Sequence, residues 1–434
     1  MSVFQRGNIS KTLTKGLDRF RYSRQSSATQ KIFKNLLSLS LLQYASYIFP
    51  LLSVPYLTRV IGVANFGSVS FAVALTTYFN VFVNYGFHLT ATRQIAINVE
   101  DVGRLRTIYS SVLWAKLVLT AGSMLVLVPV AVTAEKGSLL YFFSFAIVLG
   151  STVSMEWFFQ GIQNMKYITI IGITTRTVST ALIFIVVQTK ADFIYVPLLY
   201  GSGPILSGVL GQLLVWKKYK IFIGQFSLKE VCVQLRLGWD FFLSSAFILL
   251  YSETNIIVLG MVTSPTITGY YSAAAKTVTV VNSLWGPIPQ VLYPHFSKKY
   301  ASDLKGAIRQ LRTVLLLAGT CTFILSLAGF AAAPILVHYY LGDAFRPSVE
   351  IVRVSIFNIF AIGVSNILGV QGLLANGQNA AFRNIVLFSG ILSILLVAPL
   401  AVFYGGVGVA VCSLLIEGTV GLGLWFALRR RGLI

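Results

Sequence analysis

The sequence predicts an all-α, polytopic membrane protein with about twelve transmembrane helices, because its apolar residues are too many and too continuous for a soluble protein. Of its 434 residues, 56% are hydrophobic and only 11% are charged, and the mean hydropathy is +0.78. Soluble domains have roughly 25% charged residues. The apolar residues form runs of about 20, which match the thickness of a bilayer. These runs lack the period-2 alternation of a membrane β-barrel, so helices are the expected spanning structure.

The apolar runs divide into about twelve helices separated by short polar or glycine-containing connections. A tight turn at Gly405-Gly406 separates the last two helices, which would otherwise form one long span. Eleven and fourteen spans are the alternative counts. The predicted helices lie near residues 36–58, 68–92, 107–133, 139–162, 168–188 and 193–215, and then near 240–262, 270–295, 312–333, 350–374, 382–404 and 406–428.

The basic residues predict the orientation of these helices in the membrane. Most of the 34 Lys and Arg residues fall in the N-terminal tail, in every second loop and at the C-terminus. Loops on the cytoplasmic side of a membrane protein carry such an excess. We therefore expect both termini in the cytoplasm. The opposite loops carry only Arg59, Lys136, Lys190, Arg346 and Arg353.

The net charge of +21 does not indicate nucleic-acid binding, because the basic residues follow the membrane topology and favour contact with anionic lipids. The cysteines and histidines are equally scattered. They show neither the spacing of a disulfide framework nor that of a zinc site, so we predict no metal and no cofactor. These residues are Cys232, Cys321 and Cys412, and His88, His295 and His338.

Ionisable residues inside the predicted helices are the candidates for function, because each costs roughly 2.5–3.5 kcal/mol at the bilayer centre if it faces lipid. They must face a partner or a water-filled cavity. One interpretation is a set of structural ion pairs between neighbouring helices. The other is a cation-rich lumen for an anionic or highly hydroxylated substrate. The candidates for substrate binding and translocation are Arg59, Lys116, Glu156, Arg176, Glu253, Lys276 and Glu417.

The predicted depths of these residues suggest two clusters. Lys116, Glu156 and Arg176 lie about two turns or fewer from the cytoplasmic ends of their predicted helices. Glu253 and Lys276 lie nearer the middle of the membrane, at similar depths on consecutive helices. We therefore predict an ion pair between Glu253 and Lys276, because an unpaired charge at that depth is strongly disfavoured.

The chain also divides into two related halves. Each half begins with a helix, a glycine-containing exit, and a glycine that starts a second helix rich in small residues, as in Phe66-Gly67-Ser68 and Gly269-Tyr270. Internal repeats of this kind are common in transporters. The predicted parts are a basic cytoplasmic tail at 1–35, a six-helix lobe at 36–215, a basic cytoplasmic linker at 216–239, a second six-helix lobe at 240–428, and a cytoplasmic C-terminus at 429–434.

Three segments resemble a known family, the Wzx-type polysaccharide transporters. They are the Pro-Tyr-Leu-Thr-Arg segment within residues 50–67, the Tyr-Gly-Phe segment within residues 85–93, and the small-residue stretch at 269–276. Members of this family are flippases for lipid-linked oligosaccharides. They belong to a superfamily that also contains multidrug and toxin exporters and lipid II flippases.

The resemblance implies a fold of two six-helix lobes in a V that opens alternately to each side of the membrane. It further implies movement of an undecaprenyl-diphosphate-linked sugar unit, of O-antigen, lipopolysaccharide, capsule or exopolysaccharide type, from the cytoplasmic to the periplasmic leaflet of a bacterial inner membrane. The partners would be this lipid-linked oligosaccharide and the membrane lipids. Coupling to protons or sodium, and contact with polysaccharide polymerase machinery, are open alternatives.

Two other functions are compatible with parts of this pattern. A multidrug exporter would share the fold. A membrane-embedded polymerase or glycosyltransferase would use the same substrate, but it needs catalytic side chains in a sizeable loop. The longest external loop, 334–349, contains no closely spaced acidic pair, and the linker at 216–239 lacks a nucleotide or phosphate motif. The sequence therefore favours a transporter over an enzyme.

Overall fold

The computed structural model describes residues 42–43, 46–133, 137–283 and 287–434. Within these ranges the regular elements are helices and none is a strand, which confirms the predicted all-α class. The predicted tail at 1–35 and the start of the first predicted helix lie outside the described residues. The described part of that helix runs through residues 46–61.

In the N-terminal half, two predicted spans are each broken into two helices. The breaks fall at Tyr85-Gly86, between α2 and α3, and at Ser154-Met155, between α5 and α6. Each break places two helix ends inside a predicted span, and the backbone N–H and C=O groups at helix ends lie outside the regular helical hydrogen bonding. The elements are α2 (Val63–Asn84), α3 (Phe87–Ile97), α4 (Val102–Thr133), α5 (Ser138–Val153), α6 (Glu156–Gly161), α7 (Met165–Val186), the 3₁₀-helix η1 (Lys190–Tyr195), α8 (Val196–Leu214) and the π-helix η2 (Val215–Tyr219).

In the C-terminal half, the predicted turn at Gly405 is confirmed. Gly405 has φ 56° and ψ −137°, which divides the 52 residues of α16 into two helices. The elements are α9 (Leu228–Ser252), α10 (Thr254–Val262), α11 (Pro265–Asn282), α12 (Pro287–Ser302), α13 (Leu304–Leu336), η3 (Val337–Leu341), η4 (Asp343–Phe345), α14 (Ser348–Ser355), α15 (Phe357–Asn366), η5 (Ile367–Leu374) and α16 (Asn379–Arg430). The predicted external loop at 334–349 is therefore largely helical.

Among the described residues, eight helical segments are long and apolar enough to cross a membrane. One of them is α16, which contains two helices because of the break at Gly405. The helix through 46–61, the pair α9–α10 and the pair α11–α12 supply the other predicted spans. The chain is thus a multi-pass membrane protein, and its helices follow the predicted arrangement of about twelve spans.

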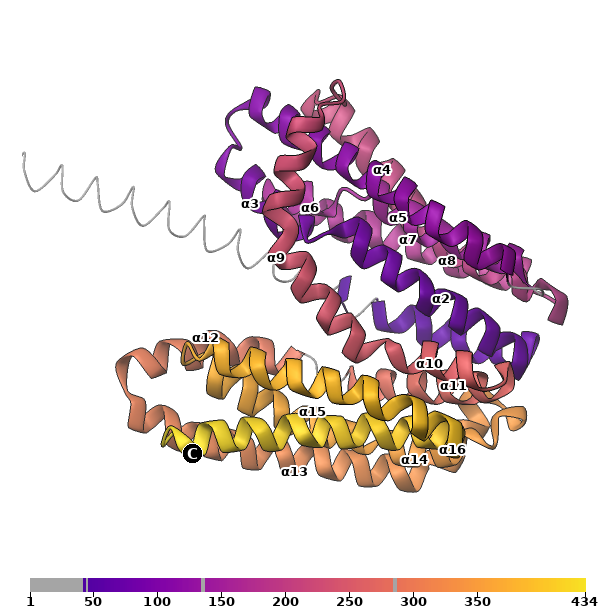
Figure 1. Cartoon of the computed structure of the whole chain (residues 1–434), viewed down its shortest axis with the longest axis vertical. Coiled ribbons are helices and arrows are strands. Elements are labelled where there is room, and N and C mark those ends of the chain that lie inside the picture. Colours follow the sequence, from indigo (N-terminus) through magenta and orange to yellow (C-terminus); the bar gives the residue numbers. More distant parts are fainter. Residues whose placement is uncertain (1–41, 44–45, 134–136, 284–286) are drawn as a thin grey trace, which may run out of the picture.

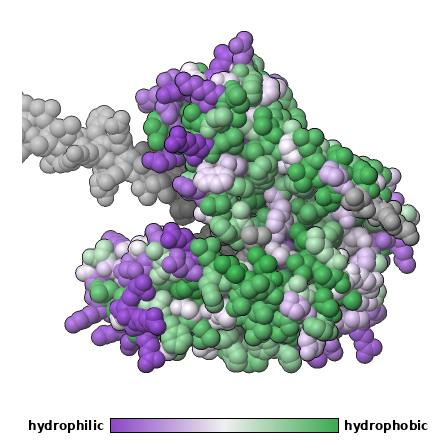
Figure 2. All heavy atoms as spheres, viewed as in Figure 1, coloured by the Kyte–Doolittle hydropathy of each residue, from purple (hydrophilic) through white to green (hydrophobic). Residues whose placement is uncertain are grey.

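The helices form two bodies that meet at one end and diverge at the other (Figure 1). One body contains α3 to α8, and the other contains α12 to α16. The elements α2, α10 and α11 lie where the bodies meet. Figure 2 shows the cleft between them, with hydrophilic atoms on both sides of its mouth and a hydrophobic belt over much of the same face. This is the predicted V shape of two lobes.

The helix α9 connects the two bodies (Figure 1). It begins at Leu228, inside the predicted linker at 216–239, and its first part packs on the N-terminal half. The side-chain amides of Gln94 and Gln234 bond to each other there at 2.8 and 3.2 Å, and the Tyr85 ring stacks on Phe242 at 4.6 Å. The amphipathic start of α9 was not recognised because its apolar residues are interleaved with lysine, glutamate and arginine.

The repeat keeps a constant spacing through the second and third spans of each half. The helices α2 and α11 begin 202 residues apart, at Val63 and Pro265, and α4 and α13 begin 202 residues apart, at Val102 and Leu304. The residue before α4 and the residue before α13 each accept the same helix-capping hydrogen bond. Asp101 accepts from the Arg104 backbone N–H and Asp303 from that of Gly306, both at 2.9 Å.

Candidate functional site

The two halves approach most closely where α2 crosses α11. A Cβ atom at Gly67 would lie 1.9 Å from the Pro265 carbonyl oxygen, and one at Gly269 would lie 2.2 Å from the Val63 carbonyl oxygen. Neither distance is compatible with a side chain, so the backbones are in direct contact through glycine. Since Val63 and Pro265 start the two repeated helices, the two contacts are related by an approximate two-fold axis. This crossing closes one end of the cleft.

Hydrogen bonds between the halves reinforce the closed end. The Thr58 hydroxyl donates to the Leu341 carbonyl at 3.0 Å, and the Arg59 guanidinium donates to the Tyr339 carbonyl. Both acceptors belong to η3, and both donors lie at the end of the helix through 46–61. Arg59 is exposed to solvent. The structure therefore places Arg59 in the closure between the halves.

Lys276 lies at the inner end of the cleft. It follows Gly269 by two turns of α11, or about 10 Å. Its Nζ atom is 5.5 Å from the centroid of the Phe66 ring and 5.8 Å from that of Tyr200, both in the N-terminal half. A cation over aromatic rings is stabilised without a counter-charge. Lys276 thus offers a positive charge at the junction of the two halves.

Glu253 and Lys276 form no ion pair within 4.0 Å in the described part of the chain, although their charges attract each other across α10 and α11, as the predicted pairing requires. In the described part of the chain, the one ion pair within 4.0 Å joins His338 to Asp343 at 2.6 Å. Glu253 lies at the break between α9 and α10, whereas the Lys276 side chain is directed to the rings of the opposite half. Similar depth along two helices does not fix the directions of their side chains.

Lys116 is buried inside the N-terminal half, with 2% of its surface exposed. Its Nζ donates to Asn84 Oδ1 at 3.1 Å and to the Ser151 carbonyl at 2.9 Å. Asn84 ends α2, and Ser151 lies in the last turn of α5, where carbonyl groups lack helical partners. Because α4 begins at Val102, Lys116 lies about 21 Å along it, deeper than predicted. This geometry is that of a structural clamp.

We expect Lys116→Met to destabilise the protein, because Asn84 Oδ1 would lose the ammonium group that it bonds and the Ser151 carbonyl would keep only the long bond from the Ser154 N–H at 3.3 Å. Loss of a partner for a buried polar group costs about 1–3 kcal/mol. The measurement is thermal unfolding of the purified protein in detergent. Unchanged stability together with lost transport would instead assign Lys116 to the translocation path.

Neither Arg176 nor Glu156 bonds directly to Lys116, although the charge of Glu156 acts on Lys116. Arg176 is in the middle of α7, about 16 Å from its start, and its guanidinium donates to the Ser46 hydroxyl at 2.5 Å. Glu156 is exposed in the first turn of α6, where a carboxylate is favoured by the helix dipole. Within the described residues no hydrogen bond or ion pair joins any two of these three side chains. Of the predicted cluster, the structure shows an electrostatic interaction between Lys116 and Glu156 and no direct bond among the three side chains.

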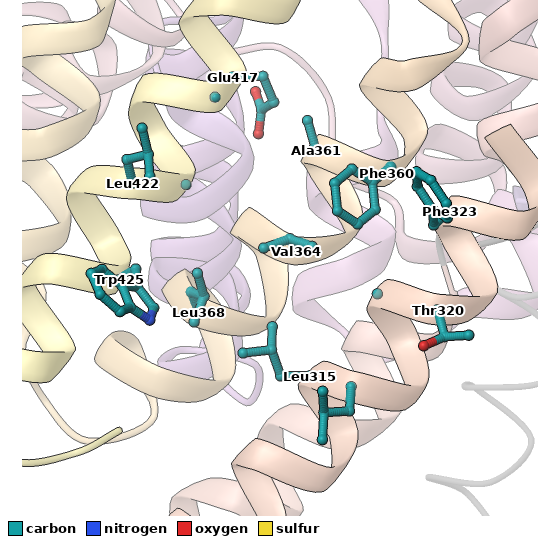
Figure 3. A pocket seen from close by; sticks show the side chains of 14 residues that line it. Leu315, Thr320, Phe323, Phe360, Ala361, Val364, Leu368, Glu417, Leu422 and Trp425 are labelled. Carbon is teal, nitrogen blue, oxygen red and sulfur yellow. The ribbon is translucent and has the colours of Figure 1, made fainter. Parts of the chain in front are cut away.

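Glu417 lies in a lateral groove of the C-terminal half, between α13, α15 and α16 (Figure 3). The groove has a volume of about 690 Å³, and apolar side chains such as Phe323, Val364 and Trp425 line it. The Ser365 hydroxyl donates to Glu417 Oε1. All lining residues come from the C-terminal half, so the structure does not place Glu417 at the junction with Lys276.

Sequence reasoning missed a set of buried polar residues on the two crossing helices. Ser70 and Asn80 lie on α2, and Ser272 and Asn282 lie 202 residues further, on α11. Their side-chain oxygens are buried and have no hydrogen-bond partner in the described part of the chain. Identical residues at the constant repeat spacing were the signal that could have found them. We refer to these four residues as the polar pairs.

Comparison with known proteins decides the family. A family model described as "Polysaccharide biosynthesis protein" matches residues 32–300. The chain belongs to this polysaccharide biosynthesis family. Two curated members are each named "Putative O-antigen transporter". The Escherichia coli (strain K12) protein is 30% identical over 391 residues, covering 88% of this chain and 93% of the relative. The Shigella dysenteriae protein is 30% identical over 390 residues, covering 88% and 96%.

Solved structures show the same fold in other transporters. The lipid II flippase MurJ in an inward closed conformation has a TM-score of 0.63 at 13% identity, covering 91% of this chain and 87% of its own. An inward-facing multidrug resistance transporter of the MATE family has a TM-score of 0.60 at 12% identity, covering 89% and 98%. The predicted fold is thereby confirmed. The family's named relatives are transporters, which confirms the prediction of a transporter and not an enzyme.

Proposed function

We propose that this protein is a flippase that moves undecaprenyl-diphosphate-linked oligosaccharide units from the cytoplasmic to the periplasmic leaflet by alternating access. The observation that most strongly supports this proposal is the position of Lys276, a cation held over aromatic rings at the inner end of a cleft between two repeated halves. A diphosphate would attract this ammonium group, because charge-assisted hydrogen bonds are the stronger ones. The sugar hydroxyls could occupy the polar pairs of α2 and α11, whose oxygens lack partners.

The membrane placement is part of the proposal. We propose that the hydrophilic mouth of the cleft and both termini lie on the cytoplasmic side of a bacterial inner membrane, because the loops expected on that side carry the excess of basic residues. The crossing of α2 and α11 then lies on the periplasmic side. We propose that the lobes at 36–215 and 240–428 move as units about this crossing, with 1–35 and 429–434 in the cytoplasm. We propose that three further side chains contribute to the shape of the lobes and to the electrostatic potential inside them, namely Arg176, Glu156 and Glu417.

Reporter fusions test this placement. We expect fusions after about residues 100, 225, 305 and 378 to report the cytoplasm, and fusions after about 136, 190, 266 and 343 to report the periplasm, because the basic loops alternate. Alkaline phosphatase and green fluorescent protein fusions provide the two readouts. One inverted reporter in the middle of the chain contradicts the twelve-span arrangement.

Reconstitution tests the activity itself. Purified protein in liposomes should expose lipid-linked oligosaccharide on the far leaflet, measured by the access of an added lectin or glycosidase. A multidrug exporter of the same fold would move cationic dyes and leave the lipid-linked sugar in place. Repeating the assay with a proton gradient, a sodium gradient or neither shows whether transport is coupled to an ion.

A further inference from the structure

A second groove opens toward lipid on the N-terminal half, between α4 and α8. Its volume is about 310 Å³. Small-ligand pockets span roughly 300–1,000 Å³, so this groove suits one alkyl chain and not a whole lipid. Leu117, Val209 and Leu213 line it and remain exposed, so the groove is open on the side that faces the hydrocarbon.

Polar side chains that are hydrogen-bonded to one another form one end of this groove, which distinguishes it from an incidental gap between helices. The Trp216 indole N–H donates to the Tyr109 hydroxyl at 3.0 Å, and Tyr109 donates to Gln212 Oε1. These three side chains line the groove, at the end that the proposed orientation places near the cytoplasmic boundary. Tryptophan and tyrosine are favoured at the membrane–water interface, where one side of the ring is apolar and the other is wet.

The segment at 220–227 passes over this end of the groove, and we name it the strap. Its backbone is fixed to α4, because the Gly224 N–H donates to the Ser110 hydroxyl at 2.7 Å and its carbonyl accepts from the Trp114 indole at 3.0 Å. Ile223 lines the groove on one side of the strap. On the other side is a hollow of about 200 Å³ that Arg106 and Ser110 line.

Positive charge surrounds the strap. Lys217 and Lys220 are exposed beside Trp216, and Arg106 lies on the opposite side. The carboxylate that lines the adjoining hollow is Glu230. Basic pockets between transmembrane helices on the cytoplasmic side bind anionic head groups. The groove therefore ends at a position that is complementary to a phosphate.

We propose that this groove binds an anionic phospholipid of the cytoplasmic leaflet. One acyl chain lies between α4 and α8, and the phosphate lies at the strap near Lys217, Lys220 and Arg106. This lipid is separate from the transported substrate, because the groove is on the outer surface of one lobe and not at the junction of the two. The inference uses the proposed orientation but not the identity of the substrate.

Native mass spectrometry tests the site, with the full-length protein exchanged into mixed phosphatidylglycerol and phosphatidylcholine. We expect the wild type to retain phosphatidylglycerol preferentially. The double variant Lys217→Gln, Lys220→Gln should lower this preference roughly thirtyfold, because two charges near the phosphate are removed. Leu213→Trp should fill the groove and reduce retention of both lipids.

The control is Leu422→Trp, which fills the lateral groove of the C-terminal half and should leave phosphatidylglycerol retention unchanged. If Leu213→Trp fails to fold, judged by thermal unfolding, Leu117→Phe takes its place. Equal retention of the two lipids by the wild type overturns the proposal. An unchanged preference in the double lysine variant, or unchanged retention in a groove-filling variant, does so as well.

Discussion

Gly67→Val should strongly reduce translocation, because it introduces a side chain where α2 and α11 touch by their backbones. The first added atom would lie 1.9 Å from the Pro265 carbonyl oxygen. Overpacking costs typically about 1–3 kcal/mol. If that cost falls on the closed state alone, the conformational equilibrium shifts roughly 5- to 150-fold away from it. The transport assay in liposomes measures the loss, and Gly269→Val should reproduce it because the two contacts are symmetric.

The matched control is Gly122→Val in α4, where an added Cβ would meet no atom within 4 Å. The conformational shift has its own readout. Ser70→Cys, placed in a background without Cys232, Cys321 and Cys412, should react faster with an impermeant maleimide from the periplasmic side when Gly67→Val is present. Normal transport and unchanged labelling in Gly67→Val would show that the crossing is not a gate.

Lys276→Gln should reduce translocation roughly 10- to 100-fold while leaving the amount of inserted protein nearly unchanged. A hydrogen bond to a charged group contributes about 1.5–3 kcal/mol, and the glutamine keeps polarity and size but loses the charge. The ammonium group of Lys276 contacts the Phe66 and Tyr200 rings, so removal of its charge should reduce the stability of the fold only slightly. Transport per molecule of protein is the measurement.

Two controls accompany Lys276→Gln. Lys276→Arg should retain most of the transport, since it keeps the charge and the cation–π contacts. Lys298→Gln removes an exposed lysine from the end of α12 and should have no effect. Reduced abundance with normal transport per molecule would make Lys276 a structural residue, and the proposed binding of a diphosphate would then lose its main support.

More of the fold than of the candidate site could be predicted from the sequence. Continuous apolar runs and alternating basic loops depend only on the bilayer, so they indicated the spans and even the turn at Gly405. The breaks at Tyr85-Gly86 and Ser154-Met155 were missed, and the structure shows Lys116 bonded beside both of them, to the Asn84 side chain and to the Ser151 carbonyl. Lys116 was noticed as a buried charge, but its acceptors come from two other helices and no local pattern encodes them.

The functional residues depend on side-chain directions that sequence spacing does not fix. The sequence singled out Lys276 and paired it with Glu253, whereas the structure places its ammonium group over rings from α2 and α8 and leaves only a longer-range attraction to the Glu253 carboxylate. Arg59 was placed near the outer end of its helix, and the structure adds its acceptor at Tyr339. The polar pairs can be recognised only from the 202-residue spacing of the repeat, and that spacing is known only once the starts of the repeated helices are known.

The path of α9 determines where motion between the lobes must be absorbed. Its first part is attached to the N-terminal lobe through Gln234 and Phe242, and α10 continues directly into the C-terminal lobe. If the lobes rotate, the backbone between them must change its dihedral angles near Glu253, where the helix is already interrupted. The Glu253 carboxylate lies at this interruption, so a change in the angle between the lobes would also change its distance from the ammonium group of Lys276 on α11.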